Sequence, residues 1–247
     1  MSYTEIHFHL LPGIDDGPAT LADSVALAAA AAAEGTRTIV ATPHVHPSHV
    51  QDPSILPELV GEVAAALEAE AIPVQVRCGG ELAHHMVSRL SDAQLDLIAH
   101  GPPEARWLLL EAALSGVDET FTEAADELRA RGFGVVMAHP ERALRHAPAG
   151  WEVIEHELAA GSAVQVNAWS LAGYYGDRVR DEAFAILRAA PVAAVASDAH
   201  GRQRMPSLQL AYAALAEAGD AEPGRRMGAV PETLLERGLP ERRAAAA

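Results

Sequence analysis

The 247-residue chain contains no lysine, and all 18 of its basic residues are arginine. A chain without lysine cannot form a Schiff base with a substrate carbonyl and has no P-loop lysine for nucleotide phosphates. Its one cysteine, Cys78, excludes an internal disulfide. A cysteine-dependent phosphatase would need an arginine six residues after the nucleophile, where His84 stands. We therefore expect Cys78 to be a buried strand residue.

Long apolar segments are also missing. No run of about 18 apolar residues that could span a membrane occurs. The N-terminus has the pattern of a strand, without the basic region and apolar core of a signal peptide. We therefore expect a soluble, cytoplasmic protein with no membrane insertion. The net charge of −16 argues against a nucleic-acid partner, because the phosphate backbone would be repelled by most of the surface.

Short apolar segments alternate with longer alanine-rich segments of helical period, a pattern typical of βα units around a parallel sheet or barrel. The predicted strands are Glu5–Leu10, Thr36–Thr42, Val74–Cys78, Arg106–Glu111, Gly134–Ala138, Ala163–Asn167 and Val192–Ser197. The predicted helices are Thr20–Glu34, Ser54–Ala71, His85–Ile98, Asp118–Arg131, Trp151–Ala160, Asp177–Ala189 and Ser207–Ala218. About seven βα units in residues 1–220 predict a single α/β domain. Residues 221–247 are expected to form a partly ordered extension that ends in a frayed tail, residues 241–247.

Polar motifs follow the carboxyl ends of six of these seven strands, where α/β barrels place their chemistry. His7 and His9 lie two residues apart on the first strand, so both imidazoles point to the same side. The following Gly- and Pro-rich turn carries two carboxylates, Asp15 and Asp16. The other candidate ligands at strand ends are His44, Glu81, Glu111, His139, Asp198 and His200.

Each of these residues alone could equally be a helix cap or a solvated turn residue. The set as a whole indicates a metal site, because nearly every carboxyl end of a strand carries an imidazole or a carboxylate. Nitrogen and oxygen ligands without thiolate favour Mn, Fe or Zn. Nine ligands suit about three divalent ions, which would leave a net positive charge that attracts an anion. Phosphate esters are the obvious substrate class.

These motifs resemble the polymerase and histidinol phosphatase (PHP) family. The likeness covers roughly residues 5–205 and is greatest to bacterial manganese-dependent tyrosine-protein phosphatases of the capsular polysaccharide type. The motifs that carry it are His7-Phe8-His9, Gly13-Ile14-Asp15-Asp16-Gly17, Ala41-Thr42-Pro43-His44, Glu81, Ala138-His139-Pro140-Glu141-Arg142 and Ser197-Asp198-Ala199-His200. The resemblance implies a distorted (β/α)7 TIM-like barrel with a trinuclear centre.

The resemblance also implies how the metal ligands divide. One ion would be held by His7, His9, Glu81 and Asp198. Glu81 would bridge to a second ion held by Glu111 and His139. Asp16, His44 and His200 would hold the third, which leaves Asp15 to cap the turn. Arg142 falls at the position of the family's phosphate-binding arginine, and Arg204 or Arg202 is a candidate for a second one.

The family therefore predicts a phosphomonoesterase in which a metal-bridging hydroxide attacks phosphotyrosine on a protein. The protein partner would be a bacterial tyrosine kinase that controls exopolysaccharide synthesis. Three alternatives stay open: a small-molecule phosphatase acting on histidinol phosphate or a biosynthetic ester, a phosphodiesterase or exonuclease, and a metal-binding module without activity. The chain departs from the family at Phe8, where cysteine is common, and in having no lysine.

The remaining histidines lie outside these motifs. Those in the loops after the second and third strands have either a substrate-related role or a purely solvated one: His46, His49, His84 and His85. Three further histidines have no motif around them and are expected at the surface: His100, His146 and His156.

Overall fold

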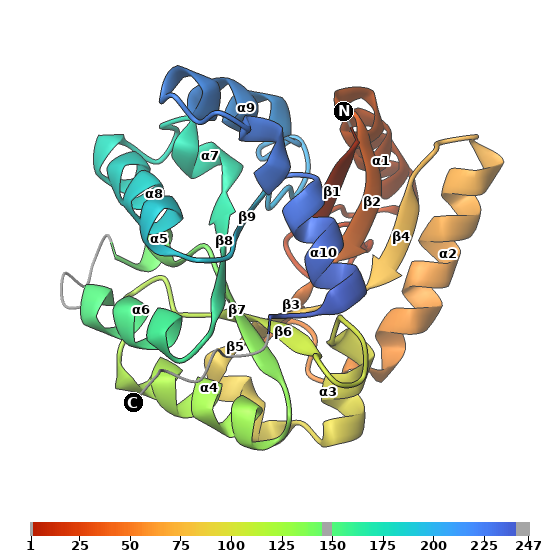
Figure 1. Ribbon diagram of the computed structural model, residues 1–247. Helices are drawn as coiled ribbons and strands as arrows, with labels where there is room; N and C mark the ends of the chain where they lie inside the picture. The colour runs from red at the N-terminus through yellow and green to blue at the C-terminus, as the bar shows by residue number, and fades with distance from the viewer. Residues whose placement is uncertain (1, 145–149, 241–247) are drawn as a thin grey trace.

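The computed structural model describes residues 2–144 and 150–240, and helices surround a set of parallel strands in it (Figure 1). The strands are β1 Tyr3–Phe8, β2 Thr36–Ala41, β3 His44–Val45, β4 Gln75–Cys78, β5 Glu81–Ala83, β6 Trp107–Glu111, β7 Gly134–Ala138, β8 Ala163–Asn167 and β9 Ala193–Ala196. The α-helices are α1 Leu21–Glu34, α2 Leu56–Ala69, α3 Asp92–Ile98, α4 Glu119–Ala130, α5 Pro140–Ala143, α6 Gly150–Ala159, α7 Ala168–Leu171, α8 Asp177–Ala189, α9 Leu208–Glu217 and α10 Ala229–Arg237. Short 3-10 helices span Pro53–Ile55, His84–Arg89 and Pro223–Arg226.

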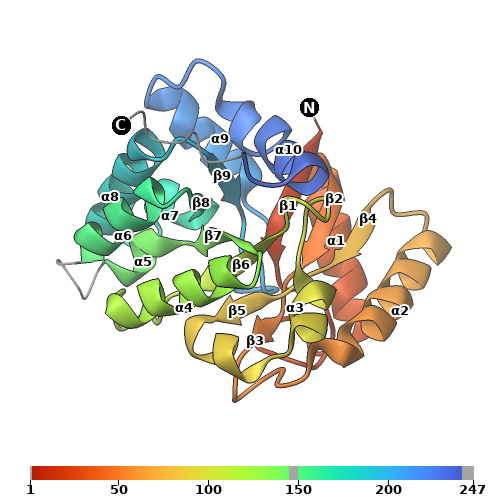
Figure 2. The same ribbon diagram turned by 60° about the horizontal axis from the view of Figure 1, so that its bottom comes forward.

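These strand segments form seven barrel strands, because two of the strands are interrupted. The order is β1-β2-β4 in one sheet and β3-β5-β6-β7-β8-β9 in the other, with every pair parallel. Along the chain, β3 continues β2 and β5 continues β4. The two ends of the barrel meet where Phe8 pairs with Ala199. Figure 2 shows the larger helices outside this ring. The predicted seven-stranded α/β barrel is therefore confirmed.

Each of the two interruptions has a physical cause. Pro43, between β2 and β3, has no N–H to donate to a strand ladder. Gly79, between β4 and β5, lies so close to neighbouring side chains that an added Cβ would come within 2.6 Å of Val40 and 2.7 Å of the His100 imidazole. Only glycine allows this approach. Each interruption redirects its strand just before a predicted ligand, His44 in the first case and Glu81 in the second.

One predicted helix is wrong. The segment His85–Ile98 is not a single helix: a 3-10 helix ends at Arg89 and α3 begins at Asp92. Ser91 separates them as the N-cap of α3, its hydroxyl accepting from the Gln94 N–H while the Gln94 side chain accepts from the Ser91 N–H. This capping box starts a new helix and so breaks the apparent periodicity.

The C-terminal segment packs across the amino ends of the strands. The indole N–H of Trp107, the first residue of β6, donates to the Leu234 carbonyl of α10 at 2.8 Å. Leu234 and Leu235 pack into an apolar cluster inside the barrel that includes Ile6 and Val136. The expected division near residue 220 stays a prediction, and the expected frayed tail, residues 241–247, lies outside the described residues.

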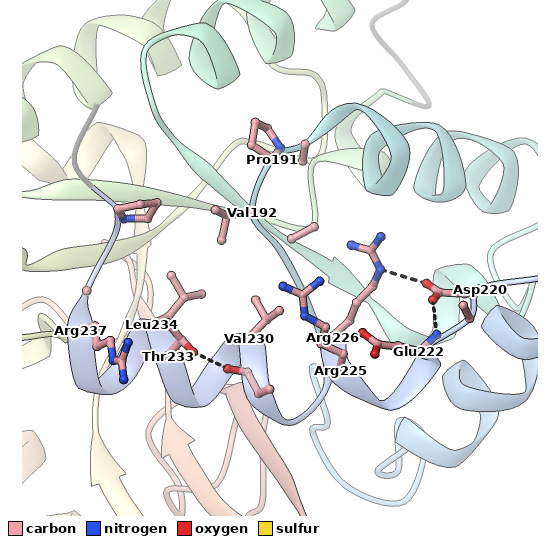
Figure 3. Close-up of a pocket in the computed structure, with 16 residues that line it drawn as sticks. Pro191, Val192, Asp220, Glu222, Arg225, Arg226, Val230, Thr233, Leu234 and Arg237 are labelled. Carbon is pink, nitrogen blue, oxygen red and sulfur yellow. Dashed lines mark hydrogen bonds and ion pairs between the residues drawn. The ribbon is translucent and has the colours of Figure 1, made fainter. Parts of the chain in front are cut away.

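A cavity of about 730 Å³ lies between α10 and the start of β9 (Figure 3). The side chains of Arg225 and Arg226 line it, and Arg226 pairs with Asp220 at 3.2 Å. This cavity is at the amino ends of the strands, whereas the predicted ligands all lie at the carboxyl ends. In residues 2–144 and 150–240, no helix has the length and apolar character needed to cross a bilayer.

Candidate metal centre

The structure brings all nine predicted ligands together at the carboxyl ends of the strands. His7 lies on β1, and the other eight residues lie at the start or end of a strand or in the loop that follows one. Their nitrogen and oxygen atoms form four overlapping groups, each close enough to hold one ion. These groups are His7-His9-Asp198, His7-Glu81-His139, His44-Glu81-Glu111 and His9-Asp16-His44-His200.

Glu81 lies at the centre of the cluster and is fully buried. Its Oε1 atom is 2.9 Å from Nε2 of His139 and 3.2 Å from Nε2 of His7. Its Oε2 atom is 2.9 Å from Nδ1 of His44 and 3.3 Å from Nε2 of His9. The two oxygens of one carboxylate therefore face different sets of imidazoles, which is the arrangement expected of a bridging ligand.

Asp198 divides its two oxygens in a similar way. Oδ1 faces the imidazoles of His7 and His9, each at 3.4 Å. Oδ2 accepts from the guanidinium groups of Arg142 at 3.0 Å and Arg204 at 2.7 Å. One buried carboxylate thus joins the ligand cluster to both predicted phosphate-binding arginines.

The third predicted set lies on the more open side of the cluster. Oδ1 of Asp16 is 3.4 Å from Nε2 of His44 and 3.2 Å from Nε2 of His200. The Asp16 side chain is 56% exposed, so this side of the cluster is accessible to solvent. The His9 ring stacks on the His200 ring at 3.6 Å, which places His9 beside this set as well.

Two of the nine residues have a strained backbone. His139 has φ of 30° and Asp198 has φ of 52°, in the left-handed region that non-glycine residues rarely occupy. Strain of this kind persists where the surroundings fix a side chain in one orientation, as functional sites often do.

Burial and neighbouring charges shift the pKa values of several candidate ligands. Burial raises the pKa of Glu111 to about 8, and the neighbouring Glu81 carboxylate adds to the rise. Burial also opposes ionisation of Glu81, but the charges of His7 and His44 prevail and hold its pKa well below the usual value. Burial lowers the pKa of His139 to about 4, so this imidazole is neutral at pH 7 and has a free lone pair.

The polar residues that form hydrogen bonds with the candidate ligands were not predicted from the sequence. Oε1 of Gln165 lies 2.8 Å from Nδ1 of His7 and accepts from the His139 N–H. Asn167 donates to Oδ2 of Asp198 at 2.8 Å. Both are on β8, the one strand without a predicted ligand, and the alternation of polar side chains along its buried sequence was the signal that could have identified them.

Asp15 caps its turn as predicted, accepting the Gly17 N–H at 2.9 Å. Its other oxygen lies 2.7 Å from Nδ1 of His9 and accepts the His44 N–H. Asp15 therefore also orients the His9 ring so that Nε2 points into the cluster, a role that its position in the turn did not reveal.

The two candidate arginines after His200 differ in position. Arg204 hydrogen-bonds Asp198 in the cluster, whereas Arg202 is exposed and lines a cavity together with Gly17 and His200. Arg142 lies with its guanidinium carbon 4.9 Å from the centre of the Tyr175 ring. Both Arg142 and Arg204 thus stand next to the ligands.

The other histidines fall into two groups. Those in the loops after β3 and β5 line a cavity of about 310 Å³ together with His44 and Glu111: His46, His49, His84 and His85. A role for them stays a prediction. The surface position expected for His100 is wrong, since its side chain is buried against Trp107, whereas His156 is exposed as expected. His146 lies outside the described residues.

The sequence matches a protein-family model and the sequences of known proteins. A family model described as "Capsular polysaccharide synthesis, CpsB/CapC" matches residues 3–228. The tyrosine-protein phosphatase YwqE of Bacillus subtilis is 32% identical over 200 residues, which cover 79% of this chain and 76% of that protein. The putative tyrosine-protein phosphatase CapC of Staphylococcus aureus is 26% identical over 209 residues, 83% of this chain and 79% of that protein.

The fold of the chain also matches solved structures. The structures of YwqE from Bacillus subtilis and CpsB from Streptococcus pneumoniae, described as unique metal-dependent tyrosine phosphatases, match with a TM-score of 0.80 and 29% identity, covering 95% of this chain and 94% of that one. A histidinol phosphate phosphatase from Lactococcus lactis matches with a TM-score of 0.54 and 14% identity over 89% of this chain and 95% of that one, which shows a shared fold only. The resemblance predicted from the motifs is confirmed, and the chain belongs to the CpsB/CapC family of capsular polysaccharide synthesis proteins.

Proposed function

We propose that this chain is a metal-dependent phosphomonoesterase that hydrolyses phosphotyrosine in proteins. The observation that carries the proposal is the convergence of nine nitrogen and oxygen ligands with two arginines, Arg142 and Arg204, at one end of the barrel. Several divalent ions and two guanidinium groups together form a binding site for a phosphate monoester dianion. The choice of phosphotyrosine is supported by two relatives that are named tyrosine-protein phosphatases.

The residues present fit a metal centre. Buried polar atoms at its heart form no hydrogen bond among the described residues, although ligand atoms of neighbouring residues lie within 3.4 Å of them: Oε2 of Glu81, Oδ1 of Asp198 and Nε2 of His200. Leaving buried polar atoms unpaired is costly, and a divalent cation would supply the missing partner. Imidazole and carboxylate ligands without thiolate suit Mn, Fe or Zn, and we propose about three ions, with Mn preferred.

The proposed division of ligands is the one that the family resemblance implies. The groups His7-His9-Asp198 and His9-Asp16-His44-His200 support two of its sets, whereas the structure groups Glu111 with His44 and Glu81, and His139 with His7 and Glu81. His7, His9 and Asp198 would hold one ion together with Glu81, whose second oxygen reaches toward the next site. Glu111 and His139 would hold the second ion, and the more open set of Asp16, His44 and His200 would hold the third. The position of His9 beside His200 makes it an additional neighbour of the third site.

Ions held by the nine ligands would supply Lewis-acid chemistry, that is, polarisation of the phosphoryl oxygens and activation of water for attack on phosphorus. The N–H groups of Arg142 and Arg204 would bind the non-bridging oxygens of the phosphate and stabilise the charge that develops on them. Asp198 keeps the two guanidinium groups together by accepting from both. Burial raises the pKa of the Cys78 thiol to about 11, which argues against cysteine as the nucleophile.

We further infer that the substrate is a bacterial tyrosine kinase that controls exopolysaccharide synthesis, and that the protein acts in the cytoplasm. The description of the family as one of capsular polysaccharide synthesis supports this choice. The net charge of −16 disfavours nucleic acid as a substrate, because the phosphate backbone would be repelled.

A substrate panel tests the proposal. The manganese-loaded protein would be assayed on a phosphotyrosine peptide, histidinol phosphate and a phosphodiester, and we expect the highest kcat/KM for the peptide. A higher kcat/KM for histidinol phosphate would assign a small-molecule phosphatase instead. A preference for the diester would indicate a nuclease-like activity.

A further inference from the structure

Three aromatic side chains gather in the segment after β8, next to the arginines. They are Trp169, Tyr174 and Tyr175, and we call them the aromatic ledge. The Trp169 and Tyr174 rings lie 4.4 Å apart, and Tyr175 lies under the Arg142 guanidinium. The chain has only 3 Trp, 4 Tyr and 4 Phe, so this one segment holds a large share of its aromatic residues.

The ledge is tied to the centre through Asn167. The Asn167 side chain accepts from the Trp169 N–H at 2.9 Å and donates to Oδ2 of Asp198 at 2.8 Å. Glu141 accepts from both the Asn167 N–H and the Ser170 hydroxyl, which fixes the start of α7. Hydrogen bonds thus fix the ledge relative to the carboxylate that holds both arginines.

A second attachment comes from the segment after β9. The Trp169 indole N–H donates at 3.1 Å to the carbonyl of Met205, the residue after Arg204. The ledge is therefore anchored beside both predicted phosphate-binding groups, through Tyr175 to Arg142 and through Met205 to Arg204.

Some apolar side chains of the ledge and its attachment are exposed and are not packed in the core. Tyr174 is 60% exposed and Met205 is 38% exposed, so their apolar surface remains in contact with water. Exposed apolar side chains beside a polar site offer a place where an apolar part of a ligand can bind.

We propose that the aromatic ledge binds the aryl ring of the substrate and so selects aryl over alkyl phosphate monoesters. In an aryl monoester a single oxygen joins phosphorus to the ring. A phosphate held by Arg142 and Arg204 therefore keeps the ring within reach of the ledge. The ring can then pack against Tyr174 and Trp169 in the offset or edge-to-face geometry that aromatic pairs prefer. This proposal rests on the proposed function, since it requires a phosphate at the metal centre.

The test uses ligands that cannot be hydrolysed. Benzylphosphonate and ethylphosphonate present the same phosphonate dianion with and without a ring, and their binding to the manganese-loaded protein would be measured by calorimetry. We expect the wild type to bind benzylphosphonate about tenfold more tightly than ethylphosphonate. Tyr174→Ala should lose most of that preference, whereas Tyr174→Phe, which retains the ring, should keep it.

The outcomes separate the two proposals. An unchanged preference in Tyr174→Ala, no preference in the wild type, or no binding of either phosphonate would overturn the role of the ledge. A ring preference that depends on Tyr174 supports the ledge even if the wild type fails to hydrolyse a phosphotyrosine peptide. In that case the proposed function fails and the aryl site stands.

Discussion

At the scale of single residues, one oxygen has an unusual number of donors. Oδ2 of Asp198 accepts from Arg142, Arg204 and Asn167, which come from three separate segments of the chain. The charges of His7 and Arg204 outweigh burial and keep the Asp198 pKa well below its usual value. A carboxylate that favours its charged form can therefore position both guanidinium groups while its other oxygen faces the histidines.

Replacing Arg142 should separate catalysis from metal binding. The guanidinium lies next to the ligands without being one, so Arg142→Ala should retain the metal content of the wild type. It should lower kcat on a phosphotyrosine peptide by roughly a hundredfold, the loss typical for one donor to transition-state charge. Elemental analysis together with steady-state kinetics would measure both quantities.

The matched control is Arg202→Ala, because Arg202 is exposed and forms no hydrogen bond or ion pair with the ligands among the described residues. This variant should behave as the wild type in both measurements. Loss of metal in Arg142→Ala, or an unchanged rate, would contradict the role assigned to Arg142.

His100 should make the stability of the fold depend on pH. Burial, with a smaller contribution from the charge of Arg77, lowers the His100 pKa to about 4, whereas an unfolded histidine has a pKa of about 6.5. Between these values the unfolded chain binds more protons than the folded one. Stability is therefore fully present above about pH 6.5 and falls as the pH drops toward 4, by on the order of 3 kcal/mol.

Urea unfolding of the wild type and of His100→Gln between pH 7 and pH 4 would measure this contribution. Glutamine does not titrate, so the variant should lose less stability than the wild type over the same range. Parallel pH profiles for the two proteins would show that His100 is not the source.

At the scale of elements, hydrophobic periodicity predicts the architecture but not its interruptions. The seven predicted strands match β1, β2, β4, β6, β7, β8 and β9 within two residues, because buried parallel strands leave a clear apolar pattern, whereas the continuations β3 and β5 were not predicted. The break at Gly79 depends on contacts with residues distant in the sequence, Val40 and His100. The division of the predicted helix at Ser91 depends on a cap, which periodicity does not record.

Helix α10 should contribute strongly to stability. Leu234 is buried inside the amino end of the barrel, and its carbonyl accepts from Trp107. Leu234→Ala should lower the free energy of unfolding by about 2–5 kcal/mol, because a cavity would remain in the barrel. The metal content of the folded protein should not change, since the ligands lie at the other end.

Denaturant unfolding would measure the effect, with Leu210→Ala as the control. Leu210 is 43% exposed on α9, and its truncation should cost no more than about 0.5 kcal/mol. Equal losses in the two variants would show that α10 does not close the barrel as described.

At the scale of the whole molecule, a chain of net charge −16 gathers the four carboxylates among its candidate ligands at one end of its barrel. Like charges in a partly desolvated site destabilise the fold, and bound cations relieve that repulsion. Metal should therefore raise the melting temperature, by roughly 5–10 °C at a hundredfold excess over the dissociation constant.

The size of this shift should depend on which ligand is removed. His200→Ala weakens one ion, whereas Glu81→Ala removes a carboxylate that faces two sets of imidazoles. We expect the metal-induced shift to be smaller in His200→Ala than in the wild type, and smallest in Glu81→Ala. Thermal melts with and without Mn would compare them, and equal shifts in all three proteins would rule out the bridging role.

The candidate site could be predicted from the sequence because its members follow strand ends in a regular order. Residues as distant as His9 and His200 meet because the barrel closes between β1 and β9. The partners behind them could not be found in this way. Gln165 and Asn167 are ordinary polar residues until the closed barrel places His7 and Asp198 against them.

The most direct test of the metal centre is a titration of metal-free protein with Mn while phosphotyrosine hydrolysis and bound metal are measured together. Nine converging ligands predict that activity is absent without metal, rises as the ions bind, and reaches its maximum at about three ions per chain. Full activity in a preparation shown by elemental analysis to be free of metal would contradict the account.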